Sequence, residues 1–189
     1  MKTYDNLDTW WTQDPLASAV LAYVADCSSA IQAGHCDPLI DVVQERAEVA
    51  PVLYRGINPE SVSVEPGEVG SHWTVEATIG PFLPATTRLE YAVDWAGEGG
   101  IVLQLLWVRA LELERLLDTH PGFEGTEDAT HDGIAVHGML RREKEWLVAT
   151  PFTARISNEA VTTRANQAGN PTTVRMVQVE ALTNPLELT

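Results

Sequence analysis

Residues 14–55, DPLASAVLAYVADCSSAIQAGHCDPLIDVVQERAEVAPVLYR, contain two helix signals followed by the first strand signal. Asp14 is a typical N-cap residue, and Pro15 suits the first position of a helix. Apolar residues then recur at helical spacing as far as Ile31, and Gly34 ends the pattern. This stretch therefore predicts a helix that begins after Asp14.

The same signal returns at Asp37 and Pro38 and predicts a second helix that ends before Pro51. From Val52 onward the pattern is mostly that of strands. The expected strands are 52–55, 62–64, 72–74, 101–108, 134–136, 145–149, 152–156 and 173–179, with helical patches around 85–95 and 109–117. Two helices followed by strands without regular βαβ alternation predict an α+β fold.

Length and composition are those of one ordinary globular domain. The chain has 189 residues, of which 44% are hydrophobic and 21% are charged, and domains of about 100 to 200 residues are the norm. We therefore expect one domain over residues 1–189, with a helical part at 1–50 and a strand-rich core at 51–189.

The charge balance excludes some classes of function. Twelve Lys and Arg against 27 Asp and Glu give a net charge of −15. No basic run is longer than Arg141-Arg142, which argues against binding to a nucleic-acid backbone. The sequence has no signal peptide and no apolar run long enough for a membrane span, so we expect a cytoplasmic protein. Cys27 and Cys36 are accordingly expected to be reduced thiols.

Metal binding is not expected either. The five histidines are scattered along the chain, at positions 35, 72, 120, 131 and 137, without HExxH or paired Cys/His spacing. Zinc sites use such spacing because the ligands must converge on one ion.

A first candidate motif is Tyr54-Arg55-Gly56, at the end of the first expected strand. A guanidinium beside a glycine can hold a phosphate or carboxylate with its planar fork while the backbone approaches closely. Taken alone, however, an arginine at a strand end is more often a surface residue or part of a structural ion pair.

A second motif, Gly70-Ser71-His72-Trp73-Thr74, combines hydroxyls, an imidazole and a large aromatic ring. On a strand, Ser71 and Trp73 face one side, and His72 and Thr74 face the other. The alternative interpretation is a tryptophan anchored in the core, with polar neighbours at the edge of a sheet.

A third motif is Glu143-Lys144-Glu145, which enters an apolar run. If all three residues lie on a strand, Glu143 and Glu145 share a face and project into one cleft. One carboxylate can then stabilise an oxocarbenium-like sugar while the other orients a nucleophile. In a chain with 27 acidic residues, an E-x-E pattern also arises by chance at a solvated edge.

In this order, the three motifs resemble the mono-ADP-ribosyltransferases of the arginine, serine, glutamate class. This superfamily includes clostridial binary toxins, vertebrate ecto-transferases and many bacteriophage enzymes, and the middle motif looks like the variant of phage-encoded members. The resemblance runs from about residue 50 onward. It implies an ADP-ribosyltransferase-like split β-sandwich, here preceded by two N-terminal helices.

The resemblance also implies roles for single residues. Arg55 would bind the phosphates of NAD, and the backbone at Arg55-Gly56 would meet the nicotinamide amide. Glu145 would hydrogen-bond the 2′-hydroxyl of the nicotinamide ribose and stabilise the oxocarbenium as nicotinamide leaves. Glu143 would position the acceptor.

The hydroxyl-bearing residues of the middle motif would hold Glu145 and the ribose. Two assignments stay open, because the motif can be taken as Ser71 with Thr74 or as His72 with Thr74. NAD would be a substrate, and no metal is implied.

The leading hypothesis is therefore an NAD-dependent transferase that modifies a macromolecule, with E-x-E favouring a protein arginine by resemblance. The acidic surface favours a basic target, such as a nucleic-acid-binding host protein met by a phage protein in the bacterial cytoplasm. The alternatives are a catalytically inactive acidic interaction protein that retains the fold, and a plain NAD glycohydrolase. Phosphate transfer from RNA is less attractive, because no arginines cluster near Arg55.

Overall fold

The computed structural model describes residues 14–60, 66–77, 80–124, 126, 130–131 and 134–182. The elements are α1 (Pro15–Gln32), α2 (Asp37–Arg46), β1 (Glu48–Val49), β2 (Leu53–Ile57), β3 (His72–Val75), β4 (Phe82–Thr86), α3 (Leu89–Ala96), β5 (Ile101–Leu106), β6 (Arg109–Glu112), α4 (Leu113–Thr119), the 3₁₀ turn η2 (Pro121–Phe123), β7 (Thr130–His131), β8 (Ile134–Ala135), α5 (Val136–Glu143), β9 (Glu145–Ala149), β10 (Phe152–Ala165) and β11 (Pro171–Ala181). The strand expected at 62–64 lies outside the described residues.

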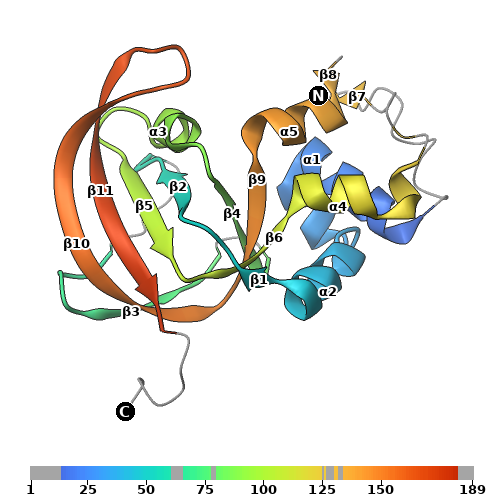
Figure 1. Ribbon diagram of the computed structural model, residues 1–189, viewed down its shortest axis with the longest axis horizontal. Coiled ribbons are helices and arrows are strands. Elements are labelled where there is room, and N and C mark those ends of the chain that lie inside the picture. Colours follow the sequence, from blue (N-terminus) through green and yellow to red (C-terminus); the bar gives the residue numbers. More distant parts are fainter. Residues whose placement is uncertain are drawn as a thin grey trace. The chain divides into compact units, whose positions relative to one another are not determined.

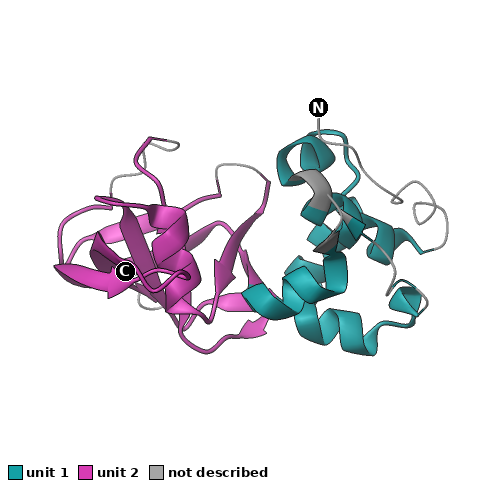
Figure 2. Cartoon of the chain, turned by 90° about the horizontal axis from the view of Figure 1, so that it is seen from above, with its two compact units in different colours: residues 1–46, 112–145 teal, residues 47–111, 146–189 magenta. Residues whose placement is uncertain are grey.

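The chain forms two compact units, coloured separately in Figure 2. Unit 1 consists of residues 1–46 and 112–145 and contains α1, α2, α4 and α5. Unit 2 consists of residues 47–111 and 146–189 and contains α3 and most of the strands. Unit 1 is thus built from two separate stretches of the chain. No helix in the described ranges is both long and apolar enough to cross a membrane.

Helix α1 begins as its capping residues predict. Asp14 Oδ1 accepts hydrogen bonds from the backbone N–H groups of Leu16 and Ala17, each at 2.9 Å. These bonds satisfy two of the donors that the first turn of a helix leaves without partners. Helix α2 follows and buries Leu39 and Val43. The predicted α+β fold with two N-terminal helices is confirmed.

The strands of unit 2 form a mixed sheet in the order β1-β6-β9-β4-β2-β5-β11-β10-β3. Strands β10 and β11 pair as a long antiparallel hairpin, whereas β11 runs parallel to β5. This hairpin is the curved orange and red pair in Figure 1. Both strands extend beyond the predicted 152–156 and 173–179. The second half of β10 is mostly exposed, so a search for apolar runs stops too early.

Two predicted helical patches overlap a strand. Strand β4 occupies 82–86 and includes Pro84, and α3 begins only at Leu89. Strand β6 occupies 109–112, and α4 begins at Leu113. In both places a strand and a helix are separated by two residues or fewer, so their periodicities merge in one sequence window.

The core of unit 2 lies on both faces of β5. Ile101, Leu103 and Leu105 belong to one buried cluster. Val102 points to the other face and packs with Ala92 and the rest of a cluster under α3. A strand that is buried on both faces gives the continuous apolar run seen in this part of the sequence.

Candidate functional site

Arg55 lies in the middle of β2, next to β5. It pairs in register with Leu103, and its side chain is partly exposed. Its guanidinium carbon lies 5.7 Å from the ring centroid of Trp95 on α3. A cation held over an aromatic face gains about 0.5–1 kcal/mol at exposed sites. The contact therefore restrains the side chain of Arg55.

Gly56 has a packing reason to be glycine. A Cβ atom at this position would lie 2.1 Å from the carbonyl oxygen of Ala92 and 2.6 Å from the backbone nitrogen of Ala96. Helix α3 thus touches the backbone of β2 directly. The close approach that the sequence suggested is made here by a helix, and this contact alone accounts for the glycine.

Strand β4 neighbours β2 through one register pair, Tyr54 with Thr86. Pro84 has no N–H to donate to a neighbouring strand. Thr86 is fully buried, and its Oγ1 accepts a hydrogen bond from the backbone N–H of Arg88 at 3.0 Å. A hydroxyl therefore lies beside the residue that precedes Arg55. Thr86 is not among the site residues predicted from the sequence, although a threonine pair is visible at residues 86–87.

On its other side, β4 neighbours β9. The backbone N–H of Thr150, directly after β9, donates to the carbonyl of Pro81, directly before β4, at 3.0 Å. The end of β9 therefore lies at the start of β4, and the two strands run antiparallel. Both have five residues, so the start of β9 is at the end of the sheet where β4 finishes.

The middle motif lies elsewhere in the sheet. Strand β3 is at its edge and pairs with β10, so β5, β11 and β10 separate it from β2. Ser71 Oγ donates to the carbonyl of Glu68 at 2.6 Å, and His72 and Thr74 are exposed. The sheet order does not bring Ser71, His72 or Thr74 next to the Arg55 strand.

Trp73 explains much of the middle motif. Its partly buried ring packs against the main core cluster of unit 2, while its neighbours His72 and Thr74 are exposed. This arrangement agrees with the alternative interpretation of a tryptophan anchor at a sheet edge. A polar and aromatic mixture is expected there, because an edge strand has one solvated side.

The prediction that Glu143 and Glu145 share a strand face is wrong. Glu143 is the last residue of α5, and Glu145 is the first residue of β9. Lys144 between them adopts the left-handed conformation, with φ 50° and ψ 51°, and caps α5 through its N–H to the carbonyl of Leu140 at 3.0 Å. Such a residue ends a helix, so the alternation of a strand does not apply to this triplet.

Glu145 is buried, with 8% of its surface exposed. Its Oε1 accepts a hydrogen bond from the hydroxyl of Tyr23 on α1, which is itself 5% exposed. Tyr23 is not among the predicted site residues because it falls on the apolar face of α1, in line with Leu16 and Val20. The signal was present, since a buried tyrosine hydroxyl requires a hydrogen-bond partner.

Glu143 is half-buried at the C-terminus of α5. Burial raises the pKa of its carboxyl, and the positive charge of Arg142 opposes the shift in part. The carbonyl groups at a helix C-terminus also disfavour a negative charge. Glu143 is thus a carboxylate in surroundings that resist its ionisation.

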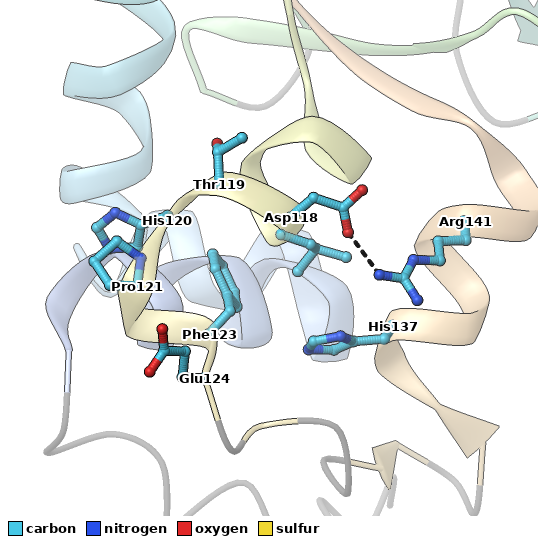
Figure 3. A pocket seen from close by; sticks show the side chains of 9 residues that line it. Asp118, Thr119, His120, Pro121, Phe123, Glu124, His137 and Arg141 are labelled. Carbon is cyan, nitrogen blue, oxygen red and sulfur yellow. Dashed lines mark hydrogen bonds and ion pairs between the residues drawn. The ribbon is translucent and has the colours of Figure 1, made fainter.

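Unit 1 also holds a cavity of about 340 Å³, shown in Figure 3. Asp118 and Arg141 form an ion pair at 2.6 Å at its wall. His137 Nε2 lies 2.8 Å from Thr126 Oγ1, and His120 Nε2 lies 3.1 Å from Asp14 Oδ1. Its polar lining is thus largely engaged in contacts within unit 1. Among the residues that the structure describes, no three His, Cys, Asp or Glu side chains form a group suited to a metal ion.

No family model matches the sequence. No curated protein matches it either. Among solved structures, the chain is similar to the enzymatic component C2-I of the C2-toxin from Clostridium botulinum, with 13% identity and a TM-score of 0.44 over 94% of this chain and 46% of that one. It is also similar to the ADP-ribosylating toxin BECa of C. perfringens, solved with NADH, with 13% identity and a TM-score of 0.47 over 88% of this chain and 40% of that one.

C3larvin, an ADP-ribosyltransferase from Paenibacillus larvae, is similar as well. The identity is 9% and the TM-score 0.45, over 93% of this chain and 92% of that one. The chain spans less than half the length of C2-I and BECa. These are likenesses of fold.

Proposed function

We propose that the protein cleaves NAD and transfers ADP-ribose to a macromolecular acceptor with release of nicotinamide. The observation that carries this proposal is the strand order β9-β4-β2. Three neighbouring strands contribute an arginine, a buried threonine and a glutamate, which are the residue types that the motif order implies. The register of Tyr54 with Thr86 and the hydrogen bond from Thr150 to Pro81 support this strand order.

In this proposal Arg55 binds the NAD phosphates, because its planar fork engages two oxygens at once. Trp95 limits the rotamers of that side chain, which lowers the entropy lost on binding. The backbone at Gly56 is proposed to meet the nicotinamide amide. The resemblance of the three motifs to mono-ADP-ribosyltransferases implies that NAD is a substrate and that no metal is required.

We assign to Thr86 the role of the hydroxyl that holds Glu145 and the ribose, in preference to Ser71, His72 or Thr74. Strand β4 lies between β2 and β9, whereas β3 is separated from β2 by three strands. Thr86 is buried and already hydrogen-bonded to backbone. A hydroxyl that is held in this way is preorganised for a polar partner, as catalytic sites require.

Glu145 is proposed as the catalytic carboxylate. An oxocarbenium that forms beside a full negative charge gains more from it than the neutral ribose of the ground state does. Glu143 is proposed to orient an acceptor guanidinium. Burial raises its pKa at the C-terminus of α5, and carboxylates with a perturbed pKa concentrate at functional sites.

The acceptor is proposed to be an arginine on a basic protein. The net charge of −15 supports a basic partner, since opposite potentials accelerate encounter. The phage origin and the cytoplasmic location of the protein remain predictions from the sequence.

The test is incubation with NAD labelled in the ADP-ribose part, together with a bacterial lysate. Nicotinamide release and incorporation of label are measured on the same sample. We expect both for the wild type and a loss of about 10²–10³ in turnover for Glu145→Gln, which keeps the shape of the side chain. Nicotinamide release without incorporation of label would identify an NAD glycohydrolase. The absence of both nicotinamide release and label incorporation would refute the proposal.

Two variants separate the roles of the other residues. Arg55→Lys should weaken NAD binding in calorimetry, because lysine lacks the planar fork. Glu143→Gln should keep NAD hydrolysis within about tenfold of wild type, while transfer to the acceptor falls much further. If hydrolysis and transfer fall together, Glu143 does not act on the acceptor.

A further inference from the structure

The contact between Tyr23 and Glu145 joins residues that are 122 positions apart in the chain. Both lie in unit 1, both are buried, and the phenol hydroxyl donates to Oε1 of the carboxylate. An ionised carboxylate taken out of water is costly unless hydrogen bonds replace its hydration. A hydrogen bond to a charged acceptor is roughly twice as strong as one between neutral groups.

Helix α1 fixes the position of the donor. The helix has 18 residues, and Asp14 caps its first turn. The tyrosine ring has two rotatable angles, so a buried ring presents its hydroxyl at one place. The donor that meets Glu145 is therefore rigid.

The residue that precedes Glu145, Lys144, is held by contacts of its own. Lys144 caps α5 through its N–H, and its amine forms an ion pair with Glu114 of α4. The backbone before Glu145 is therefore anchored to α4 and α5, while its carboxylate is tied to α1. Support of both the preceding backbone and the carboxylate is typical of a residue whose orientation matters.

We propose that Tyr23 is a positioning residue for the carboxylate of Glu145. It holds one carboxylate oxygen, and so it fixes the direction in which the charge faces the reacting ribose. This inference rests on the proposed function, in which Glu145 stabilises the oxocarbenium. It gives the helical unit a part in catalysis that the three sequence motifs do not contain.

The test is a cycle of four proteins: wild type, Tyr23→Phe, Glu145→Gln and the double variant. Tyr23→Phe removes one hydroxyl and keeps the ring in its place. We expect its kcat for nicotinamide release to fall about ten- to hundredfold, with the Kd for NAD in calorimetry within about twofold of wild type. Tyr91→Phe is the matched control, because Tyr91 is a buried tyrosine of α3, and it should keep the wild-type kcat.

The double variant separates positioning from a general structural role. If Tyr23 acts through Glu145, adding Tyr23→Phe to Glu145→Gln changes kcat by less than about twofold. An equal loss in both backgrounds would overturn the inference, and so would a Tyr23→Phe variant with wild-type turnover. A wild type that releases no nicotinamide overturns the proposed function itself, and this result is distinct from the other two.

A further measurement covers loss of stability. If Tyr23→Phe melts below the assay temperature, adding Glu145→Gln should raise its melting temperature, since a neutral amide loses less than a carboxylate when one buried hydrogen bond is removed. A double variant that melts no higher than Tyr23→Phe would overturn the inference that Tyr23 supports the carboxylate of Glu145.

Discussion

Replacement of Gly56 by alanine tests the packing of α3 on β2. The new Cβ would lie 2.1 Å from Ala92 O, 2.6 Å from Ala96 N and 2.8 Å from Trp95 Cβ. Carbon and oxygen atoms approach to about 3.3 Å at closest, so helix and strand must part by about 1 Å. The two nearest atoms belong to the helix backbone and cannot rotate away.

The magnitude follows from what the separation affects. A gap of about 0.5–1 Å forfeits a quarter to a half of the dispersion energy of the contacts it opens. The contacts involved are those of the buried cluster under α3, which includes Val93, Val102 and Val174. Overpacking costs about 1–3 kcal/mol and sometimes more. We expect Gly56→Ala to lower the free energy of unfolding by about 3 kcal/mol, at the upper end of this range.

Gly138 provides the matched control. It lies in α5, and the nearest atom to a Cβ there is 3.9 Å away. Gly138→Ala should raise stability by about 0.5–1 kcal/mol, because alanine loses less backbone entropy in a helix. The assay is urea denaturation followed by circular dichroism and tryptophan fluorescence. A Gly56→Ala protein within about 0.5 kcal/mol of wild type would refute the reasoning.

Three further predictions concern titration, capping and thiol chemistry. Burial raises the pKa of Glu143, so the ionised carboxylate opposes folding. Glu143→Gln should therefore be more stable than wild type at pH 7. The difference in urea midpoint should vanish below about pH 4, where the carboxyl is protonated in both the folded and the unfolded protein. Asp14→Ala should lose about 1–2 kcal/mol in the same assay, because it removes the α1 cap and the contact with His120; Asp14→Asn should retain most of the capping energy, and a similar loss in both variants would contradict this. Burial raises the pKa of the Cys36 thiol to about 12. A disulfide reagent at about pH 8 should therefore modify the partly exposed Cys27 first and Cys36 only on unfolding. Rapid labelling of Cys36 in the native protein would disprove this prediction.

Local signals in the sequence were sufficient for the elements that depend on neighbouring residues. The caps and periodic stripes predicted α1 and α2, and the apolar run 145–149 predicted β9 with its observed bounds. Capping and amphipathic periodicity act within one or two turns, so a single sequence carries them in full. The same holds for the presence of Arg55 on an early strand and of Glu145 at the start of a later one.

Local signals failed where one element ends and another begins. Lys144 adopts a left-handed conformation, which a lysine in the sequence does not indicate. Glu143 therefore ends a helix and Glu145 begins a strand, although both were expected on one strand. Strand β4 joins closely to α3, and so its last two residues fell within the helical patch predicted around 85–95. Each case is decided by a single backbone state, which periodicity does not resolve.

The sequence by itself determined the residue types available for chemistry and most of the elements that carry them. Only the tertiary structure decided which of them are neighbours: β4 lies between β9 and β2, β3 lies at the far edge of the sheet, and Tyr23 meets Glu145. Gly56 likewise has its reason in a helix that follows it in the chain. Strand order and buried hydrogen bonds arise between segments far apart in sequence, and so they leave no periodic signal in either segment.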